Sequence, residues 1–183
     1  MKNEGLVMGA RKKDVYFFER QRYRQWWLWA IMVGLNLLFI GGFILQIIFN
    51  KPFGNNPMSD AGLIITTGIF LLLSIYLLSG SLKTFINSDG IYIKYSPFHV
   101  RYKFYDWRDI DSVQIRRYNP LREFGGWGIR FGKHGTKAYN VSGKIGVEFF
   151  FKNGKSVLIG TNQPDYLKTV LKQLGKMEHK NDG

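Results

Sequence analysis

Two long apolar stretches dominate the first half of the chain, and they cover residues 26–49 and 61–82. Neither stretch contains Lys, Arg, Asp, Glu or His. A helix rises about 1.5 Å per residue, so about twenty such residues cross a hydrocarbon core of about 30 Å. Residues 50–60 between the stretches are rich in the turn formers Pro, Gly and Asn. The pattern therefore predicts a hairpin of two transmembrane helices joined by an extracytoplasmic turn.

Three other interpretations of these stretches are less economical. A cleaved signal peptide has a shorter apolar core and a small-residue cleavage site, which the first stretch lacks. A chain of 183 residues is too short to bury two helices that are apolar on all sides in one soluble core. A helix that lies in the membrane interface needs a polar face, and neither stretch has one.

From residue 83 onward the pattern changes to short, β-type runs separated by turn residues. The pairs Asp89-Gly90 and Asn153-Gly154 are typical of tight hairpins. Near the end, Pro164 suits the first position of a helix and Gly175 the position after its last turn. The residues between them carry an apolar stripe at helical spacing, Leu167, Val170, Leu171 and Leu174. We predict an α+β, mostly β domain of about seven strands closed by one C-terminal helix over residues 83–175, followed by a polar tail, 176–183.

The distribution of charge gives the hairpin a direction. Lys and Arg outnumber Asp and Glu by 26 to 13, for a formal net charge of +13. Basic residues flank both outer ends of the hairpin, whereas the turn has only Lys51, which Asp60 balances. By the positive-inside rule both termini are cytoplasmic, in the plasma or inner membrane, and residues 1–25 form a basic cytoplasmic segment. The charge excess favours an anionic partner, and the lipid headgroups beside a tethered domain explain it more economically than nucleic acid, which we do not expect.

Seven residues beside the helices are candidates for anchoring the chain to the lipid surface: Arg20, Arg22, Arg24, Trp26, Trp27, Trp29 and Lys83. Indole rings favour the interface, and basic side chains attract anionic headgroups. Ordinary juxtamembrane anchoring is the simpler interpretation, and a grip on anionic lipid is the functional one. Within the stretches, Asn36 and Gln46 are predicted to bond between the helices. Five glycines would allow close helix approach, Gly34, Gly41, Gly42, Gly62 and Gly68.

Three segments of the predicted domain carry a family resemblance: FINSDGIYIKYSPF at 85–98, WRDIDSVQI at 107–115 and GVEFFFKNGKSVLIGTNQPDYLKTVL at 146–171. On these segments the chain resembles bacterial two-pass membrane proteins of uncharacterised function with a pleckstrin-homology-like (PH-like) domain. The resemblance implies a seven-stranded antiparallel sheet or barrel capped by a C-terminal helix, and no catalytic role. Eukaryotic relatives often hold phosphoinositides with a basic first hairpin loop. Here that loop is expected at residues 87–90, which are acidic, so this specificity is not carried over.

Residues that could carry catalysis are few. The chain has no cysteine, which excludes thiolate metal sites and cysteine nucleophiles. Its three histidines lie far apart in the sequence. The acidic cluster Asp106, Asp109 and Asp111 is better suited to turns and helix caps than to catalysis. The glycine-rich stretch 125–135 lacks the spacing of a phosphate-binding loop. We therefore expect no catalytic, cofactor or metal site.

Two hypotheses for the function follow. The first is a membrane-anchored, non-enzymatic scaffold that contacts a partner protein, a second copy of the chain or the anionic membrane surface. The second is a membrane enzyme that acts on a lipid or cell-envelope substrate through Asp106, Asp109, Asp111 or His134. The first is preferred because the sequence shows no catalytic constellation.

Overall fold

The computed structural model describes residues 15–132 and 135–177. Two compact units make up the chain: Tyr23–Gly80 is one, and Met1–Arg22 together with Ser81–Gly183 is the other. The N-terminal part of the second unit is thus separated in the sequence from the rest of that unit by the whole of the first. Residues 1–14 and 178–183, and with them most of the predicted tail, lie outside the described residues.

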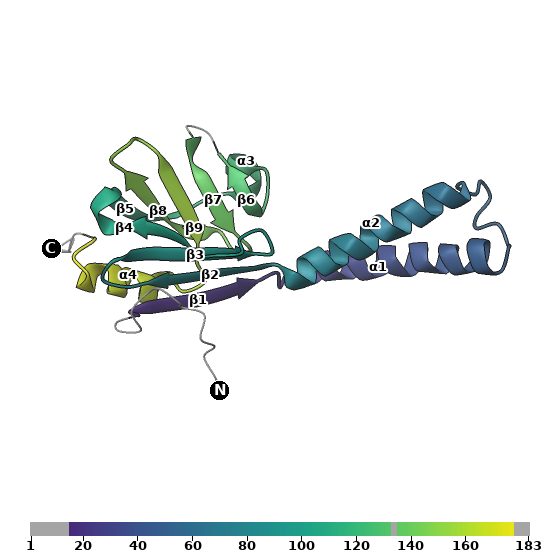
Figure 1. The fold of residues 1–183 in the computed structure, drawn as a ribbon, viewed down its shortest axis with the longest axis horizontal. Helices are drawn as coiled ribbons and strands as arrows, with labels where there is room; N and C mark the ends of the chain where they lie inside the picture. The colour runs from purple at the N-terminus through teal and green to yellow at the C-terminus, as the bar shows by residue number, and fades with distance from the viewer. Residues whose placement is uncertain (1–14, 133–134, 178–183) are drawn as a thin grey trace. The chain divides into compact units, whose positions relative to one another are not determined.

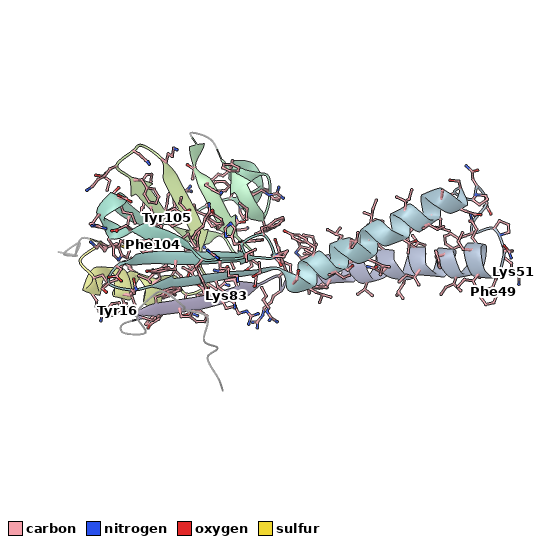
Figure 2. The ribbon with its side chains drawn as sticks, in the orientation of Figure 1. Tyr16, Phe49, Lys51, Lys83, Phe104 and Tyr105 are labelled. Carbon is pink, nitrogen blue, oxygen red and sulfur yellow. The ribbon has the colours of Figure 1, made fainter. Side chains whose placement is uncertain are left out.

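The first unit is a helical hairpin. Helix α1 covers Trp26–Phe43 and continues as a π-helical turn, η1, over Ile44–Ile48. Helix α2 covers Asp60–Ser79, and its N-cap Ser59 accepts a hydrogen bond from the Gly62 N–H. Both helices are long and apolar enough to cross a membrane, and only 11% of the most apolar stretch of each is buried. This exposure is the opposite of what a core helix of a soluble protein shows. In Figure 2, Phe49 and Lys51 mark the turn between the helices.

Polar side chains bond within the hairpin as the sequence predicts. The Asn36 amide donates to Ser74 Oγ on α2 at 2.7 Å, and the Gln46 amide donates to Asp60 Oδ1 at 2.6 Å. The rings of Phe39 and Phe70 stack 4.9 Å apart. The prediction that five glycines allow close helix approach is wrong, because a Cβ added at any of them has no atom of the opposite helix among its nearest neighbours. A Cβ added at Gly42 would meet the Phe53 ring at 2.8 Å and one at Gly62 would meet Met58 and Ser59, whereas three positions face open space, Gly34, Gly41 and Gly68.

The second unit contains two sheets (Figure 1). The first has the order β1-β2-β3-β4 and is antiparallel throughout. Its strands are β1 (Phe17–Arg22), β2 (Ser81–Ile86), β3 (Gly90–Ser96) and β4 (Lys103–Asp106). The sequence analysis placed residues 17–22 in a segment outside the domain, but they form an edge strand of it. The sequence did not reveal this strand because β1 forms by pairing with β2, and β2 begins only after the entire helical hairpin in the sequence.

The second sheet has the order β5-β8-β9-β7-β6, with β7 and β9 parallel. Its strands are β5 (Ile110–Arg117), β6 (Gly128–Phe131), β7 (Lys137–Asn140), β8 (Ile145–Phe151) and β9 (Ser156–Gly160). A 3₁₀ turn, η2 (Trp107–Asp109), leads into β5, and a short helix, α3 (Pro120–Phe124), follows it. The described residues therefore hold nine strands in two sheets, where the sequence predicted about seven.

The core lies between the inner faces of the sheets and the C-terminal helix α4 (Pro164–Gln173). Fully buried side chains come from all three, among them Ile93, Phe149 and Leu171. Pro164 stands in the first turn of α4, and Gly175 has the positive φ of 65° that ends such a helix, as predicted. The Asp89-Gly90 pair leads into β3, and Asn153-Gly154 lies between β8 and β9, also as predicted.

Candidate functional site: the cationic face of the four-stranded sheet

Strict alternation along β1 divides its side chains between two faces. Phe17, Glu19 and Gln21 are buried, whereas Phe18, Arg20 and Arg22 are exposed. Since successive strand residues point to opposite sides, the first set faces the core and the second set lies on the outer face of the sheet. The alternation of buried and exposed side chains in FFERQR is typical of a strand with one face in the core and one in solvent.

Buried polar side chains of β1 attach it to the connection between β9 and α4. Glu19 is 4% exposed, and its carboxylate accepts hydrogen bonds from Thr161 Oγ1 and from the Asn162 N–H, both at 2.7 Å. The Gln21 amide donates to the Gly160 carbonyl at 2.6 Å. Phe17 adds a ring contact with Tyr166 of α4 at 5.6 Å. These contacts fix the face on which Arg20 and Arg22 lie.

The strand register places three cations in one row across the outer face. Arg20 is the partner of Lys83 across β1 and β2, and Lys83 is the partner of Lys94 across β2 and β3. The described residues provide no ion-pair partner for any of the three. Like charges directly opposite one another destabilise a sheet. An anion bound at this row would therefore lower the free energy of the folded domain. We call Arg20, Lys83 and Lys94 the cationic row; Figure 2 labels Lys83 on β2.

An aromatic row runs beside the cationic row on the same face. Phe18 is the partner of Phe85, Phe85 of Tyr92, and Tyr92 of Phe104. The Phe85 and Tyr92 rings stack 4.2 Å apart, and the Tyr92 and Phe104 rings are 4.6 Å apart. The two ends of the row are open to solvent, with Phe18 54% and Phe104 46% exposed. A surface that joins cations to exposed aromatic rings is suited to an anionic, amphipathic partner.

Tyr102, the residue directly before β4, lies beside the cationic row. The Lys94 ammonium lies 6.0 Å from the centre of the Tyr102 ring, and the Phe85 ring meets that ring edge-on at 5.2 Å. Burial raises the pKa of the Tyr102 hydroxyl, and nearby Arg20 acts in the opposite direction. The sequence analysis missed Lys94 and Tyr102 as members of this face because only the strand register reveals them.

The seven predicted anchoring residues fall into two groups. Arg20, Arg22 and Lys83 lie on the outer face of the sheet, where Arg22 is the partner of Ser81. The other four belong to the helical unit: Arg24, Trp26, Trp27 and Trp29. Trp26 is 78% exposed and Trp27 42%, as side chains at a lipid interface would be. The Trp29 indole N–H instead donates to the Tyr23 carbonyl at 3.2 Å, so its polar edge is satisfied within the chain.

The candidate acidic site is not assembled as a metal centre. Asp106 accepts two hydrogen bonds from the Arg108 side chain through its Oδ2, and this pairing lowers the pKa of Asp106 to about 2. Asp109 and Asp111 are exposed. The described residues contain no group of three His, Asp or Glu side chains that could hold a metal ion. His134 lies outside the described residues.

The described residues 125–132 of the glycine-rich stretch follow α3 and contain β6. Asn119 caps this helix by accepting from two backbone N–H groups, and Gly125 ends it with a φ of 68°. The Gly128 N–H then donates to Asn140 Oδ1 at 2.8 Å at the start of β6. These contacts explain the conformation of residues 119–128 through interactions within the chain.

A pocket of about 480 Å³ lies on the outer face of the second sheet, and Arg116 and Glu148 line it. The Arg116 Nε donates to Glu148 at 2.6 Å, and its Nη1 donates to Glu123 at 2.8 Å. Ser156 Oγ donates to the other oxygen of Glu148 at 2.9 Å. Because the guanidinium already serves two carboxylates, it is not available to an anionic ligand. The cationic row, whose charges are unpaired, is the stronger candidate.

His99 gives the loop between β3 and β4 a dependence on pH. The Tyr95 backbone N–H donates to His99 Nδ1 at 3.2 Å, which requires a neutral ring. The backbone N–H of His99 donates to the Tyr95 carbonyl at 2.8 Å. Burial, Lys103 and Lys137 lower the pKa of His99 from its ordinary 6.5. The folded state thus favours the neutral ring, so its contribution is complete above about pH 6.5 and is lost as the pH falls through the lowered pKa.

We therefore expect acid to loosen this loop. The difference in unfolding free energy between wild type and His99→Ala should shrink as the pH falls from about 7.5 to about 5. Chemical denaturation of the full-length chain in detergent at several pH values measures it. A difference that grows on acidification would contradict the lowered pKa.

Comparison of the sequence with models of known protein families finds no match, and comparison with curated proteins finds none either.

Proposed function

We propose that the chain is a two-pass membrane protein whose sheet domain is a non-enzymatic binding module for the anionic surface of the membrane that anchors it. The observation that carries this proposal is the cationic row, in which Arg20, Lys83 and Lys94 are opposite one another without a described acidic partner. Each basic residue near an anionic leaflet contributes about 1 kcal/mol of attraction. Lys83 follows the last residue of α2 by a few positions in the sequence, so the tether keeps it near the bilayer.

Both ends of the hairpin belong on one side of the membrane in this proposal. Its support is that β1, which precedes the hairpin, and β2, which follows it, pair along six residues of one sheet. The basic flanks then favour the cytoplasmic side, so we place both termini in the cytoplasm and the turn at residues 50–60 outside. Reporter fusions at residues 56 and 183 test this orientation.

We also propose that the domain is PH-like. In support, β1–β4 form one antiparallel sheet, β5, β8 and β9 lie together in the other, and α4 follows β9. In the proposed assignment these seven strands and α4 correspond to the seven strands and C-terminal helix of a PH-like domain, and β6 and β7 are an added hairpin. In this assignment the connection between the first two strands is the helical hairpin itself, and residues 87–89 join the second and third strands.

A protein partner or a second copy of the chain is the alternative occupant of the same face. The exposed aromatic side chains of Phe18 and Phe104 favour it, because aromatic anchors dominate many protein interfaces. The enzyme hypothesis has weaker support, since Asp106 is engaged by Arg108. Nucleic acid and cofactors are not part of the proposal.

Reversing the central charge of the row tests lipid binding. Lys83→Glu should weaken binding to vesicles that contain anionic lipid by about tenfold or more, because the change removes one attraction and adds one repulsion. Co-sedimentation measures it on a soluble domain in which a two-residue Asn-Gly turn replaces residues 23–80. Binding should also fall at high salt.

Lys152→Glu is the matched control, since it makes the same change in net charge at an exposed position between β8 and β9. It should reduce binding much less than Lys83→Glu. Equal effects of the two substitutions would mean that only the net charge matters. Indifference to lipid charge altogether would leave the protein partner as the occupant of the face.

A further inference from the structure

The loop between β3 and β4, residues 97–102, carries the most exposed large apolar side chain described in the domain. Val100 is 84% exposed and Phe98 is 62% exposed. Arg101, next to them, is also exposed. Apolar side chains held in water beside a cation are typical of segments that enter a membrane interface.

The strand register places this loop at the end of the sheet where the chain passes to and from the helices. Arg22, the last residue of β1, is the partner of Ser81, the first residue of β2. Ser81 is in turn the partner of Ser96, the last residue of β3. Residue 97 therefore starts the loop in the same row in which β1 leads into α1 and α2 leads into β2.

The loop is held in a defined conformation. His99 exchanges two hydrogen bonds with the backbone of Tyr95, and its ring meets the Tyr139 ring edge-on at 5.6 Å. With His99 held against the domain, its two neighbours Phe98 and Val100 are the exposed ones. The loop is thus pre-organised, and little further ordering opposes insertion.

The loop is also continuous with the cationic row. Its last residue, Tyr102, lies against Lys94 and Phe85. A bilayer that meets the row would therefore meet the loop as well, with headgroup phosphates at the cations and hydrocarbon at the apolar side chains.

We propose that this loop inserts Phe98 and Val100 into the interface of the bilayer that holds the hairpin, while Arg101 binds lipid phosphate. The inference rests on the proposed function, because it requires that α1 and α2 span that bilayer. Insertion of the loop adds an apolar contact at a defined depth in the bilayer to the electrostatic attraction of the cationic row.

Site-directed labelling of the full-length chain in vesicles tests the insertion. Because the chain has no cysteine, Val100→Cys gives a single site for a nitroxide label. Its matched control is Ser88→Cys, at an exposed position between β2 and β3 at the far end of the same strands. That position is about 20 Å from the loop along the seven residues of β3. The label at 100 should be accessible to oxygen and shielded from a water-soluble relaxation agent, and the label at 88 should show the reverse.

Three outcomes separate this inference from the proposed function. A lipid-exposed label at 100, retained in zwitterionic vesicles, supports insertion, because apolar contact does not need lipid charge. A water-exposed label at 100 combined with binding that depends on Lys83 overturns insertion alone. A water-exposed label together with binding that ignores both lipid charge and Lys83→Glu overturns both proposals.

A substitution gives a second readout. In the full-length chain labelled at Val100→Cys, adding Phe98→Asp should shift the label at 100 toward water, because a charged side chain opposes insertion. Adding Leu121→Asp on α3, where Leu121 is 63% exposed, should leave the label exposed to lipid. A label at 100 that is equally exposed to lipid in the two variants would overturn the proposal.

Discussion

A domain that begins at Ser81 is expected to fail to fold, and adding back residues 15–22 should restore it. Without β1, the buried strand β2 becomes an open edge with unpaired backbone groups, which favours aggregation. Thr161 and the Asn162 N–H lose the buried carboxylate of Glu19, and α4 loses the contact of Tyr166 with Phe17. Unpaired buried polar groups cost about 1–3 kcal/mol each, a large part of the stability of a small domain.

The restored version is simple to build. Arg22 and Ser81 are opposite one another in the register, and antiparallel partners lie about 5 Å apart. A two-residue Asn-Gly turn in place of residues 23–80 spans that distance. We expect this version to be soluble and to unfold in one cooperative thermal transition, followed by circular dichroism. A third version with the order of residues 17–22 scrambled should behave like the truncated one. If the truncated domain unfolds as cooperatively as the joined one, β1 is dispensable and the interpretation is wrong.

Removing the Arg116 side chain is expected to cost about 3 kcal/mol of unfolding free energy. The Glu148 side chain is 6% exposed and has Arg116 as its only ion-pair partner among the described residues. Arg116→Ala leaves that carboxylate buried with the Ser156 hydroxyl alone. Urea denaturation of the full-length chain in detergent, followed by circular dichroism, measures the loss.

Two control variants show whether the pairing causes the loss. Arg117→Ala, at the exposed neighbouring position, should change the unfolding free energy by no more than about 0.5 kcal/mol. The double variant Arg116→Leu with Glu148→Leu should be more stable than Arg116→Ala, because it leaves no buried charge unpaired. A loss in the double variant as large as in the single one would mean that Arg116 acts through packing instead.

The parts of the fold that the sequence predicts well are those in which local signals suffice. The two apolar helices, the Asn153-Gly154 turn and the start of α4 at Pro164 each depend on residues close together in the chain. Strand β1 could not be found in this way. Its six residues, FFERQR, include the basic Arg20 and Arg22 and precede a long apolar helix, so the segment resembles the basic flank of a membrane span until its partner strand is known.

The candidate site shows the same limit. Arg20 and Lys83 could be nominated for their charge and their closeness to the helices, but Lys94 joins them only through the register of β2 and β3. Exposure of Val100 likewise depends on how His99 is held, which the sequence does not state. Charge and composition favour the kind of partner that we propose, whereas pairing across strands shows which residues share one face.

The four-stranded sheet combines β1, which precedes the helical hairpin in the sequence, with β2–β4, which follow it, and this order has a consequence for biosynthesis. β1 is translated first, yet its partner β2 emerges only after all of Tyr23–Gly80. At about 5–20 residues per second, several seconds pass before β2 emerges, and in the proposed topology both helices insert during that time. In the proposed topology, pairing requires that the nascent chain cross the bilayer twice and return to the side on which β1 was left. A chain with one failed crossing keeps the two strands on opposite sides and cannot complete the sheet. In the proposed topology, folding of the domain therefore depends on correct insertion of both helices.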